Sequence, residues 1–321
     1  MLQALGMSTL TQLEYLLAVD RERHFGKAAK ACFVSQPSLS AQIQKLEDEL
    51  GVVIFDRSRK PILVTEAGKG IIKQAALVLR EHKKIQVIAD TRALEPRGDF
   101  ELAVIPTLAP YVIPLFIGDF GRKYPGVNLV VHEYKTDDII RMLYNDELDA
   151  GLLVTPLRDD GLIERHLYYE AFYCYLNGQH PLMEKEYIAE KDLGCGDLWL
   201  LSEGHCFRNQ MLKICAAGQD QCVYPNIRFE SGSLETLIKL VDANSGFTLL
   251  PRMAVDEMRT HGAARRIKPF MDPVPTREVS LVYNRSFLKE TILNALEKSI
   301  LDNLPGHIRS LKKQQVQVVD I

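Results

Sequence analysis

The segment from Ser35 to Gly51 constrains the fold of this 321-residue chain more than any other feature of the sequence. Ser35 is a good helix N-cap, proline follows in the first turn where a missing N–H is tolerated, and Gly51 is a suitable helix stop. At about 100° per residue, one apolar stripe is expected on this helix. The stripe consists of Leu39, Ile43, Leu46 and Leu50. The opposite face carries Ser38, Ala41, Gln42 and Lys45.

The polar face of this helix suits nucleic acid, because hydroxyl, amide and ammonium groups complement base edges and phosphates. A merely solvated helix would carry more glutamate, whereas here the acidic residues Glu47, Asp48 and Glu49 are confined to the C-terminal end. Gln36, Ser38 and Gln42 are predicted to read bases, and Lys45, Arg57 and Arg59 to hold phosphates. The full set of expected DNA contacts is Ser35, Gln36, Pro37, Ser38, Ser40, Gln42, Lys45, Arg57, Arg59 and Lys60.

The flanking sequence completes a winged helix-turn-helix over residues 1–65. A capping box is predicted at Thr11, opening a helix with an apolar face of Leu13, Leu16 and Leu17. An alanine-rich helix over Lys27–Cys32 follows, and two β-prone runs, Val52–Phe55 and Ile62–Val64, flank a basic hairpin tip. Such a tip is a plausible wing against the DNA backbone or minor groove.

A long helix is expected next, from Glu66 to about Leu94, with a hinge by residue 97. Its apolar residues recur at spacings of three and four, as in a coiled-coil seam. The seam consists of Ile71, Ala75, Val78, His82, Ile85 and Ala89. A narrow stripe without an obvious partner in the same chain predicts a dimer through residues 66–97.

Residues 98–308 alternate between β-prone runs and amphipathic helical segments, which is typical of an α/β fold. The expected strands are Phe100–Ile105, Val127–His132, Asp149–Val154, Leu198–Leu201, Ile227–Glu230, Gly246–Leu250 and Glu278–Tyr283. The expected helices include Thr136–Asn145, His205–Ala217, Ser233–Ala243 and one near the C-terminal end. No function can be assigned to the tail, residues 309–321.

Charge and composition indicate a protein that lies outside membranes, in a compartment where thiols stay reduced. Residues 1–95 carry 14 Lys/Arg against 11 Asp/Glu, a net of +3, and the rest of the chain a net of −6. This fits a DNA-binding head on a body that avoids DNA. The N-terminus has no basic stretch before an apolar run, so no signal peptide is expected and the protein is predicted to be cytoplasmic. No cofactor, metal site or membrane partner is indicated.

Of the six cysteines, Cys206 has the most distinctive surroundings, because it lies at an expected helix start beside His205 and Arg208. A helix N-terminus and a neighbouring cation both stabilise a thiolate, so this thiol is predicted to be the most acidic. Cys215 follows nine residues later, which on a continuous helix is about 13 Å along the axis and on the opposite face. A disulfide between them therefore requires unwinding, which suits a redox switch. Cys222 is an alternative partner.

The first ninety residues resemble the LysR-type transcriptional regulators. The similarity rests on Phe25–Glu47, with Val34-Ser35-Gln36-Pro37-Ser38 and Gln44-Lys45-Leu46-Glu47, and continues through Phe55-Asp56-Arg57 to Thr65-Glu66-Ala67-Gly68. Leu148-Asp149-Ala150-Gly151 and Gly246–Pro251 extend it to the second part. The resemblance implies a two-lobed fold like the periplasmic binding proteins, with lobe I at 98–168 and 275–308 and lobe II at 169–274. It also implies binding to inverted-repeat half-sites in double-stranded DNA, a homodimer or homotetramer, and contact with RNA polymerase.

The motif Gly204-His205-Cys206-x-Arg208-x-Gln210 with Cys215 resembles the peroxide-responsive members of that family. Ile105-Pro106-Thr107, His132-Glu133 with Thr136, and Ser233–Leu237 agree with the same group. The resemblance implies that Cys206 reacts with hydrogen peroxide and forms a reversible disulfide with Cys215, which a thiol reductant resets. The peroxide would be bound by Thr107, Thr136, His205, Cys206 and Arg208.

Two other functions stay open from the sequence. One is a LysR-type regulator gated by a small organic anion between the lobes, with the cysteines incidental. The other is a thiol enzyme using Cys206 and His205, which the DNA-binding head and the lack of a carboxylate signal near His205 disfavour. The sequence therefore predicts a redox-gated, DNA-binding activator of antioxidant genes that is not an enzyme.

Overall fold

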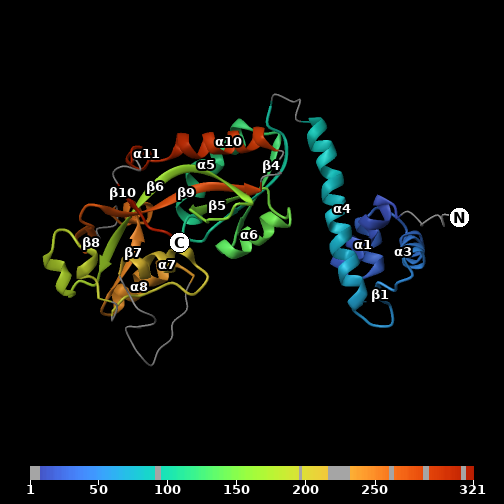
Figure 1. The fold of residues 1–321 in the computed structure, drawn as a ribbon, viewed down its shortest axis with the longest axis horizontal. Helices are drawn as coiled ribbons and strands as arrows, with labels where there is room; N and C mark the ends of the chain where they lie inside the picture. The colour runs from blue at the N-terminus through green and yellow to red at the C-terminus, as the bar shows by residue number, and fades with distance from the viewer. Residues whose placement is uncertain are drawn as a thin grey trace. The chain divides into compact units, whose positions relative to one another are not determined.

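The computed structural model describes residues 8–90, 95–194, 197–215, 232–259, 264–284, 289–311 and 316–321. It divides into two compact units, Met1–Arg92 and Ala93–Ile321, each with its own hydrophobic core (Figure 1). No described helix is long and apolar enough to cross a membrane. The expected strand Ile227–Glu230, Cys195 and Cys222 lie outside the described residues.

The first unit is a helix-turn-helix with a two-stranded wing, followed by a long helix. Its elements are α1 (Leu10–Glu22), α2 (Phe25–Ala31), α3 (Gln36–Leu50), β1 (Phe55–Asp56), β2 (Leu63–Val64) and α4 (Glu66–Asp90). Ser35 is the N-cap of α3, and Gly51 ends it in the left-handed conformation, as predicted. The capping box of α1 is formed by Thr9 and Gln12, so its predicted position at Thr11 was wrong by two residues.

The apolar stripe of α3 is confirmed for its first three members, since Leu39, Ile43 and Leu46 are fully buried. Leu50 is 42 % exposed, and its inclusion in the stripe was wrong. The helix ends at Leu50 and Gly51 turns the chain away, so the last side chain of the stripe extends beyond the core. Gly68 packs the start of α4 against the wing, because a Cβ there would lie 2.5 Å from the carbonyl oxygen of Ile54.

Glu47, near the C-terminal end of α3, joins this helix to the wing. Its side chain is 4 % exposed and accepts hydrogen bonds from the N–H groups of Ile54 and Phe55 at 2.7 and 3.1 Å. The Arg57 guanidinium donates to its second oxygen at 2.6 Å and lies 5.0 Å from the Phe25 ring centroid. One buried carboxylate thus fixes the orientation of the wing against the recognition helix.

We expect Glu47→Ala to destabilise the first unit by about 2–4 kcal/mol, because two buried N–H groups and a guanidinium lose their acceptor. Hydrogen exchange of the segment 52–64 in the full chain measures this directly. Asp48→Ala is the matched control, since Asp48 is exposed on the same turn, and it should change the free energy by less than about 0.5 kcal/mol. Equal exchange in the two variants would contradict the structural role of Glu47.

The second unit is built on one eight-stranded sheet. The strands are β3 (Gly98–Val104), β4 (Val127–Glu133), β5 (Ala150–Thr155), β6 (Leu162–Leu176), β7 (Phe247–Pro251), β8 (Ile267–Pro269), β9 (Val274–Asn284) and β10 (Val316–Val318). The order is β4-β3-β5-β9-β6-β7, with β10 pairing to β9 and β8 to β6. Strands β3, β4 and β5 are parallel to one another, whereas β9 is antiparallel to both β5 and β6.

The α-helices of the second unit are α5 (Ala109–Lys123), α6 (Thr136–Tyr144), α7 (Cys206–Ile214), α8 (Leu234–Ala243), α9 (Arg252–Arg259), α10 (Glu290–Asn303) and α11 (Gly306–Arg309). Three short 3-10 helices are η1 (Pro181–Glu184), η2 (Glu190–Asp192) and η3 (Ala264–Arg266). Helix α10 lies on one side of β5 and β9, packed on α5, and α6 covers the other side (Figure 1).

Two long antiparallel strands, β6 and β9, connect the two lobes. The first part of β6 and the last part of β9 belong to the sheet of lobe I, and the remainder of β6 carries β7 and β8 of lobe II. The expected lobe boundaries, at residues 168/169 and 274/275, lie within β6 and at the start of β9. The carboxyl ends of β3 and β4 in lobe I face the start of α7 in lobe II, where the predicted site residues lie.

Three expected elements differ in the structure. Leu198–Leu201 is not a regular strand, because only Leu198 forms an isolated bridge, to Phe247. Helix α7 ends at Ile214 with Cys215 as its C-cap, so the predicted helix was too long within the described residues. The tail, which had no predicted structure, forms β10 and pairs in parallel with the start of β9.

Candidate functional site

The polar face of α3 is exposed, as a DNA-reading surface requires. The side chains of Gln36, Ser38, Gln42 and Lys45 lie in solvent, and the Ser35 hydroxyl caps the helix by accepting the Ser38 N–H at 3.3 Å. Pro37 occupies the first turn of α3. On the wing, Lys60 is exposed, and Arg59 is 70 % exposed with only a 3.8 Å ion pair to Asp56.

Arg57 differs from the other predicted phosphate ligands. Its side chain is 34 % exposed and its guanidinium is bonded to Glu47, with a longer contact of 3.5 Å to the Ser40 hydroxyl. The cation is therefore already paired within the protein, and its first role is to hold the wing on α3. Ser40 is half-buried beneath it.

Four of the five predicted peroxide ligands line one narrow pocket between the lobes. Thr107 follows β3, Thr136 begins α6, and His205 and Cys206 begin α7. None of the four is more than 8 % exposed. Arg208 is not among the lining residues, since its guanidinium donates to the carbonyl oxygen of Leu201 at 3.0 Å. Three segments far apart in sequence thus bring two hydroxyls and an imidazole to one thiol.

The position of Cys206 follows from the turn before it. Gly204 has a φ of 83°, a conformation that favours glycine, and a Cβ there would lie 3.2 Å from the Lys135 side chain. Lys135 donates from Nζ to the carbonyl oxygen of Glu203 at 2.8 Å, which ties the start of α6 to this turn. His205 is then the N-cap of α7 and Cys206 its first residue, as predicted.

The cation that acts on Cys206 is Arg277, which the sequence prediction missed. Arg277 lies on β9, is fully buried, and pairs with the equally buried Glu170 on β6 at 2.7 Å. It also donates to the hydroxyl and carbonyl oxygens of Thr107 at 3.0 and 3.1 Å, and lies 5.3 Å from the Phe207 ring centroid. Glu170 and Arg277 are direct cross-strand partners. The available signal was a pair of opposite charges, Glu170 and Arg277, each within a few residues of an expected lobe boundary.

The ionisation of Cys206 is set by opposing effects. Burial raises the pKa of the Cys206 thiol, and the Thr136 hydroxyl, the Arg277 charge and the N–H groups at the start of α7 work against that increase. Burial and the charge of Lys135 lower the pKa of His205, so its imidazole is neutral at neutral pH. His205 and Arg208 are therefore not the cations that stabilise the thiolate, contrary to expectation.

We expect the rate of Cys206 oxidation to rise about tenfold per pH unit between pH 6 and 8, because only the thiolate reacts and the thiol is mostly protonated there. The raised pKa gives this sign, since the thiolate fraction grows until the pH passes the pKa. Stopped-flow measurement of the oxidation rate in strongly buffered solutions tests this pH dependence. The Cys215→Ser variant is used so that only the first step is observed. A flat profile over this range would contradict it.

Cys215 lies at the other end of the same helix and is 2 % exposed. The structure holds both residues as thiols. Nine residues of helix separate them by about 13 Å, whereas a disulfide requires Cα atoms within about 7 Å. The structured α7 therefore keeps the two sulfurs apart.

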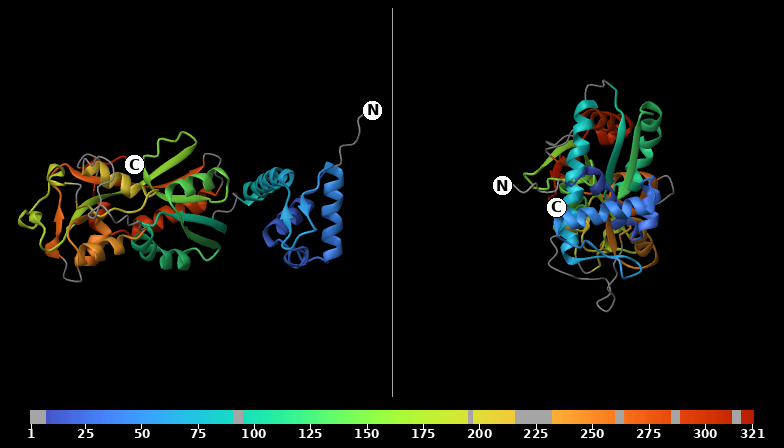
Figure 2. Two further views of the ribbon diagram at one scale, coloured as in Figure 1. Left: turned by 90° about the horizontal axis from the view of Figure 1, so that it is seen from below. Right: turned by 90° about the vertical axis from the view of Figure 1, so that its right-hand side faces the viewer.

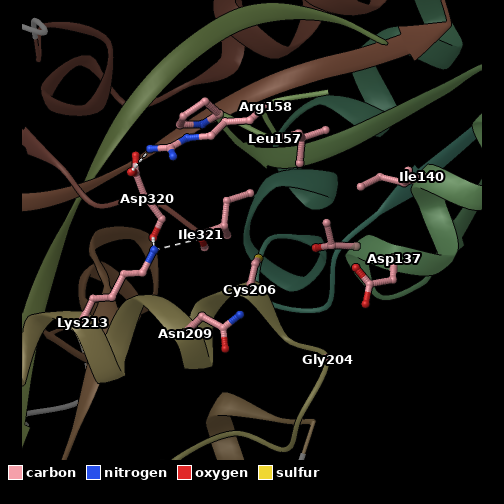
Figure 3. Close-up of a pocket in the computed structure, with 12 residues that line it drawn as sticks. Asp137, Ile140, Leu157, Arg158, Gly204, Cys206, Asn209, Lys213, Asp320 and Ile321 are labelled. Atoms are coloured by element: carbon pink, nitrogen blue, oxygen red, sulfur yellow. Dashed lines mark hydrogen bonds and ion pairs between the residues drawn. The ribbon is translucent and has the colours of Figure 1, made fainter. Parts of the chain in front are cut away.

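A larger cavity of about 320 Å³ adjoins Cys206 on the solvent side (Figure 3). Its walls come from α6, the segment after β5, helix α7 and the tail. The lining residues are Thr136, Asp137, Ile140, Pro156, Leu157, Arg158, Gly204, Cys206, Asn209, Lys213, Asp320 and Ile321. This cavity gives a small solute a route to the thiol.

Comparison with known protein families matches both units. Residues 10–69 match the bacterial regulatory helix-turn-helix protein, lysR family, and residues 93–304 match the LysR substrate binding domain. A hydrogen peroxide-inducible genes activator from Dickeya chrysanthemi is 35 % identical over 95 % of this chain and 99 % of its own length. The DNA-binding transcriptional dual regulator OxyR of Escherichia coli is 35 % identical over 96 % of this chain and 99 % of its own.

Solved structures agree with this result. A variant of full-length OxyR from Pseudomonas aeruginosa is 35 % identical, with a TM-score of 0.72 over 92 % of this chain and 98 % of that one. A hydrogen peroxide-bound OxyR mutant from Corynebacterium glutamicum is 27 % identical, with a TM-score of 0.58 over 93 % of each chain. The chain belongs to the LysR family of bacterial helix-turn-helix regulators, with a two-lobed effector domain. Several relatives that it resembles over nearly its full length are OxyR proteins.

Proposed function

We propose that this chain is a DNA-binding transcription regulator that responds to hydrogen peroxide through a reversible disulfide between Cys206 and Cys215, and so activates antioxidant genes. The observation that carries the proposal is the convergence of Thr107, Thr136 and His205 on a buried thiol at a helix N-terminus. The names of the relatives, hydrogen peroxide-inducible genes activators, point to the same signal.

The first chemical step uses the thiolate of Cys206. The sulfur attacks one peroxide oxygen, the O–O bond breaks, and the leaving hydroxide takes a proton to become water, which leaves Cys206 as a sulfenic acid. The Thr136 hydroxyl, buried in the same pocket as the Cys206 thiol, is available to donate a hydrogen bond to the peroxide. Thr107 is held in place by Arg277 and is the second hydroxyl of the pocket.

The second step is attack by the sulfur of Cys215 on the sulfur of Cys206. The S–S bond forms, the S–O bond breaks, and the hydroxide leaves with the thiol proton as a second water. Two thiols are oxidised and one peroxide is reduced to two waters. Because α7 must unwind, the disulfide stabilises an altered lobe surface and so changes the spacing of the DNA-binding units. Two equivalents of a thiol reductant reverse the change.

The assembly proposed is a dimer through α4, or a tetramer if the effector domains also pair. Ala75 and Leu79 of α4 pack into the core of the first unit, so Ala75 is not available to the seam. Val78, His82 and Ile85 are exposed within the chain, and Ile85 is 63 % exposed. An exposed apolar stripe on a long helix fits a partner helix.

We place this assembly in the cytoplasm, with RNA polymerase as its partner at inverted-repeat promoter sites, and without enzymatic turnover.

We expect Gln36→Ala and Arg59→Ala to weaken DNA binding in two different ways. Loss of the Gln36 amide should reduce discrimination between operator and random duplex by about 1–3 kcal/mol, because a base contact is lost. Loss of the exposed Arg59 cation should weaken binding to both duplexes and lower the salt slope by about one unit. Fluorescence anisotropy at several salt concentrations measures both. Identical salt slopes and specificity ratios in the two variants would refute the assignment.

The proposed function is tested by titrating thiols before and after stoichiometric peroxide. We expect one peroxide to remove two thiols and the reaction then to stop until a reductant is added. Continued turnover without reductant would identify a thiol enzyme. No loss of thiols would favour gating by a small organic anion.

A further inference from the structure

Residues 316–321, here called the strap, lie against the helix that carries both reactive cysteines. The strap begins as β10, which pairs with β9 through Val316 opposite Val274. It continues with the Val319 N–H donating to the carbonyl oxygen of Thr276 at 2.9 Å. Figure 1 and the left view of Figure 2 both place the end of the chain beside α7. The strap thus lies between a crossing strand and the sensor helix.

Two side chains of α7 hold the strap. Gln210, fully buried, donates from Nε2 to the carbonyl oxygen of Val319 at 2.7 Å. Lys213 donates from Nζ to the carbonyl oxygens of Asp320 and Ile321 at 3.2 and 2.9 Å. Residues three apart share one face of a helix, and both lie between Cys206 and Cys215. The strap therefore braces the very turns that must unwind before a disulfide can form.

The far end of the strap reaches lobe I. The Asp320 carboxylate pairs with Arg158, which follows β5, and both residues line the cavity beside Cys206 (Figure 3). Six residues therefore connect β9, α7 and lobe I at one place. Unwinding α7 breaks the Gln210 bond and leaves a buried amide without an acceptor, which is costly.

We propose that the strap is a brake on the second chemical step, and that Gln210 and Lys213 are positioning residues that keep Cys206 and Cys215 apart until it is released. The inference rests on the proposed function. A helix of nine residues is marginal by itself, so its stability comes from tertiary contacts such as these. The strap makes no hydrogen bond to Thr107, Thr136 or His205 among the contacts described, although Asp320 and Ile321 line the cavity that leads to Cys206. The brake therefore requires that sulfenic acid formation keep its parental rate when the strap is loosened.

The test compares the two steps separately in the full chain. Lys213→Ala removes both lysine contacts at an exposed position of α7. A chain ending after Leu311 removes the strap completely. We expect the rate of disulfide formation, measured by acid quench and thiol labelling, to rise about tenfold in each variant. In the Cys215→Ser background, sulfenic acid formation at Cys206 should keep its parental rate in both.

Gln317→Ala is the matched control, because Gln317 is exposed on β10 and has no side-chain contact with α7 among those described. It should leave both rates unchanged. Parental disulfide rates in Lys213→Ala and in the shortened chain would overturn the brake while leaving the proposed function intact. Acceleration of sulfenic acid formation to the same degree would make the strap an access gate instead and would also overturn it. Failure of Cys206 to oxidise in the parent protein would refute the proposed function itself.

Discussion

Cys206→Ser is expected to abolish the response to peroxide, whereas Cys215→Ser should still form a sulfenic acid but fail to keep the switched state. The physical reason is that the two cysteines lie at opposite ends of α7, in different surroundings. Cys206 lies at the helix start, lines the pocket and adjoins the solvent-side cavity, whereas Cys215 is buried at the other end. Of these two cysteines, Cys206 is therefore the one that meets peroxide while the helix is intact, and serine is far too weak a nucleophile to replace it.

Mass spectrometry after sub-stoichiometric peroxide, with a sulfenic acid trap, measures this order of reaction. Cys174→Ser is the control, since Cys174 is fully buried on β6 and burial raises its pKa well above the ordinary value. It should behave as the parent. Sulfenic acid appearing first on Cys215 or Cys222, or a disulfide that omits Cys206, would refute the assignment.

Arg277→Met is expected to lower both the stability of the protein and the reactivity of Cys206. It leaves the Glu170 carboxylate buried with no cation, and removing one partner of such a pair costs about 3–5 kcal/mol. It also removes the charge that lowers the pKa of Cys206, so the oxidation rate at pH 7 should fall about tenfold or more. Thr107 loses its guanidinium donor at the same time.

The double variant Glu170→Gln with Arg277→Met separates the two effects. The neutral pair should recover part of the lost stability, because no unpaired charge stays buried. Cys206 should nevertheless remain slow, since the cation is still missing. Thermal unfolding and stopped-flow oxidation give the two readouts. Recovery of the parental oxidation rate in the double variant would show that Arg277 acts on Cys206 only through stability.

Local patterns predicted the first unit well because its signals lie within a few residues of one another. The cap at Ser35, the stop at Gly51 and the buried positions of α3 all follow from a single helix. The prediction that Leu50 is buried was wrong because its exposure depends on the direction in which the chain leaves the helix. Helical periodicity does not describe that direction. The burial of Glu47 depends on where the wing folds back, which is a tertiary fact.

The site was predicted in part, and the missing part is non-local. A motif at residues 204–210 identified the thiol and its helix start, and strand ends identified Thr107 and Thr136. The cation that acts on the Cys206 thiol is Arg277 on β9, more than sixty residues beyond Cys206. Local sequence instead pointed to Arg208, which is the nearest arginine but donates to the carbonyl oxygen of Leu201. The tail carried no motif, so its pairing with β9 could not be predicted from local sequence.

The position of β9 between β5 and β6 also has a consequence for synthesis on the ribosome. Strand β5 ends at Thr155 and β9 ends at Asn284, so 129 residues are added to the chain between the end of β5 and the end of β9. At about 5–20 residues per second, the edge of β5 waits roughly 6–26 s for its neighbour. That edge is apolar and wholly buried in the finished protein, and unpaired apolar edges promote aggregation. Lobe I is therefore begun first and completed near the end of synthesis, and during this interval the unpaired edge of β5 is open to aggregation.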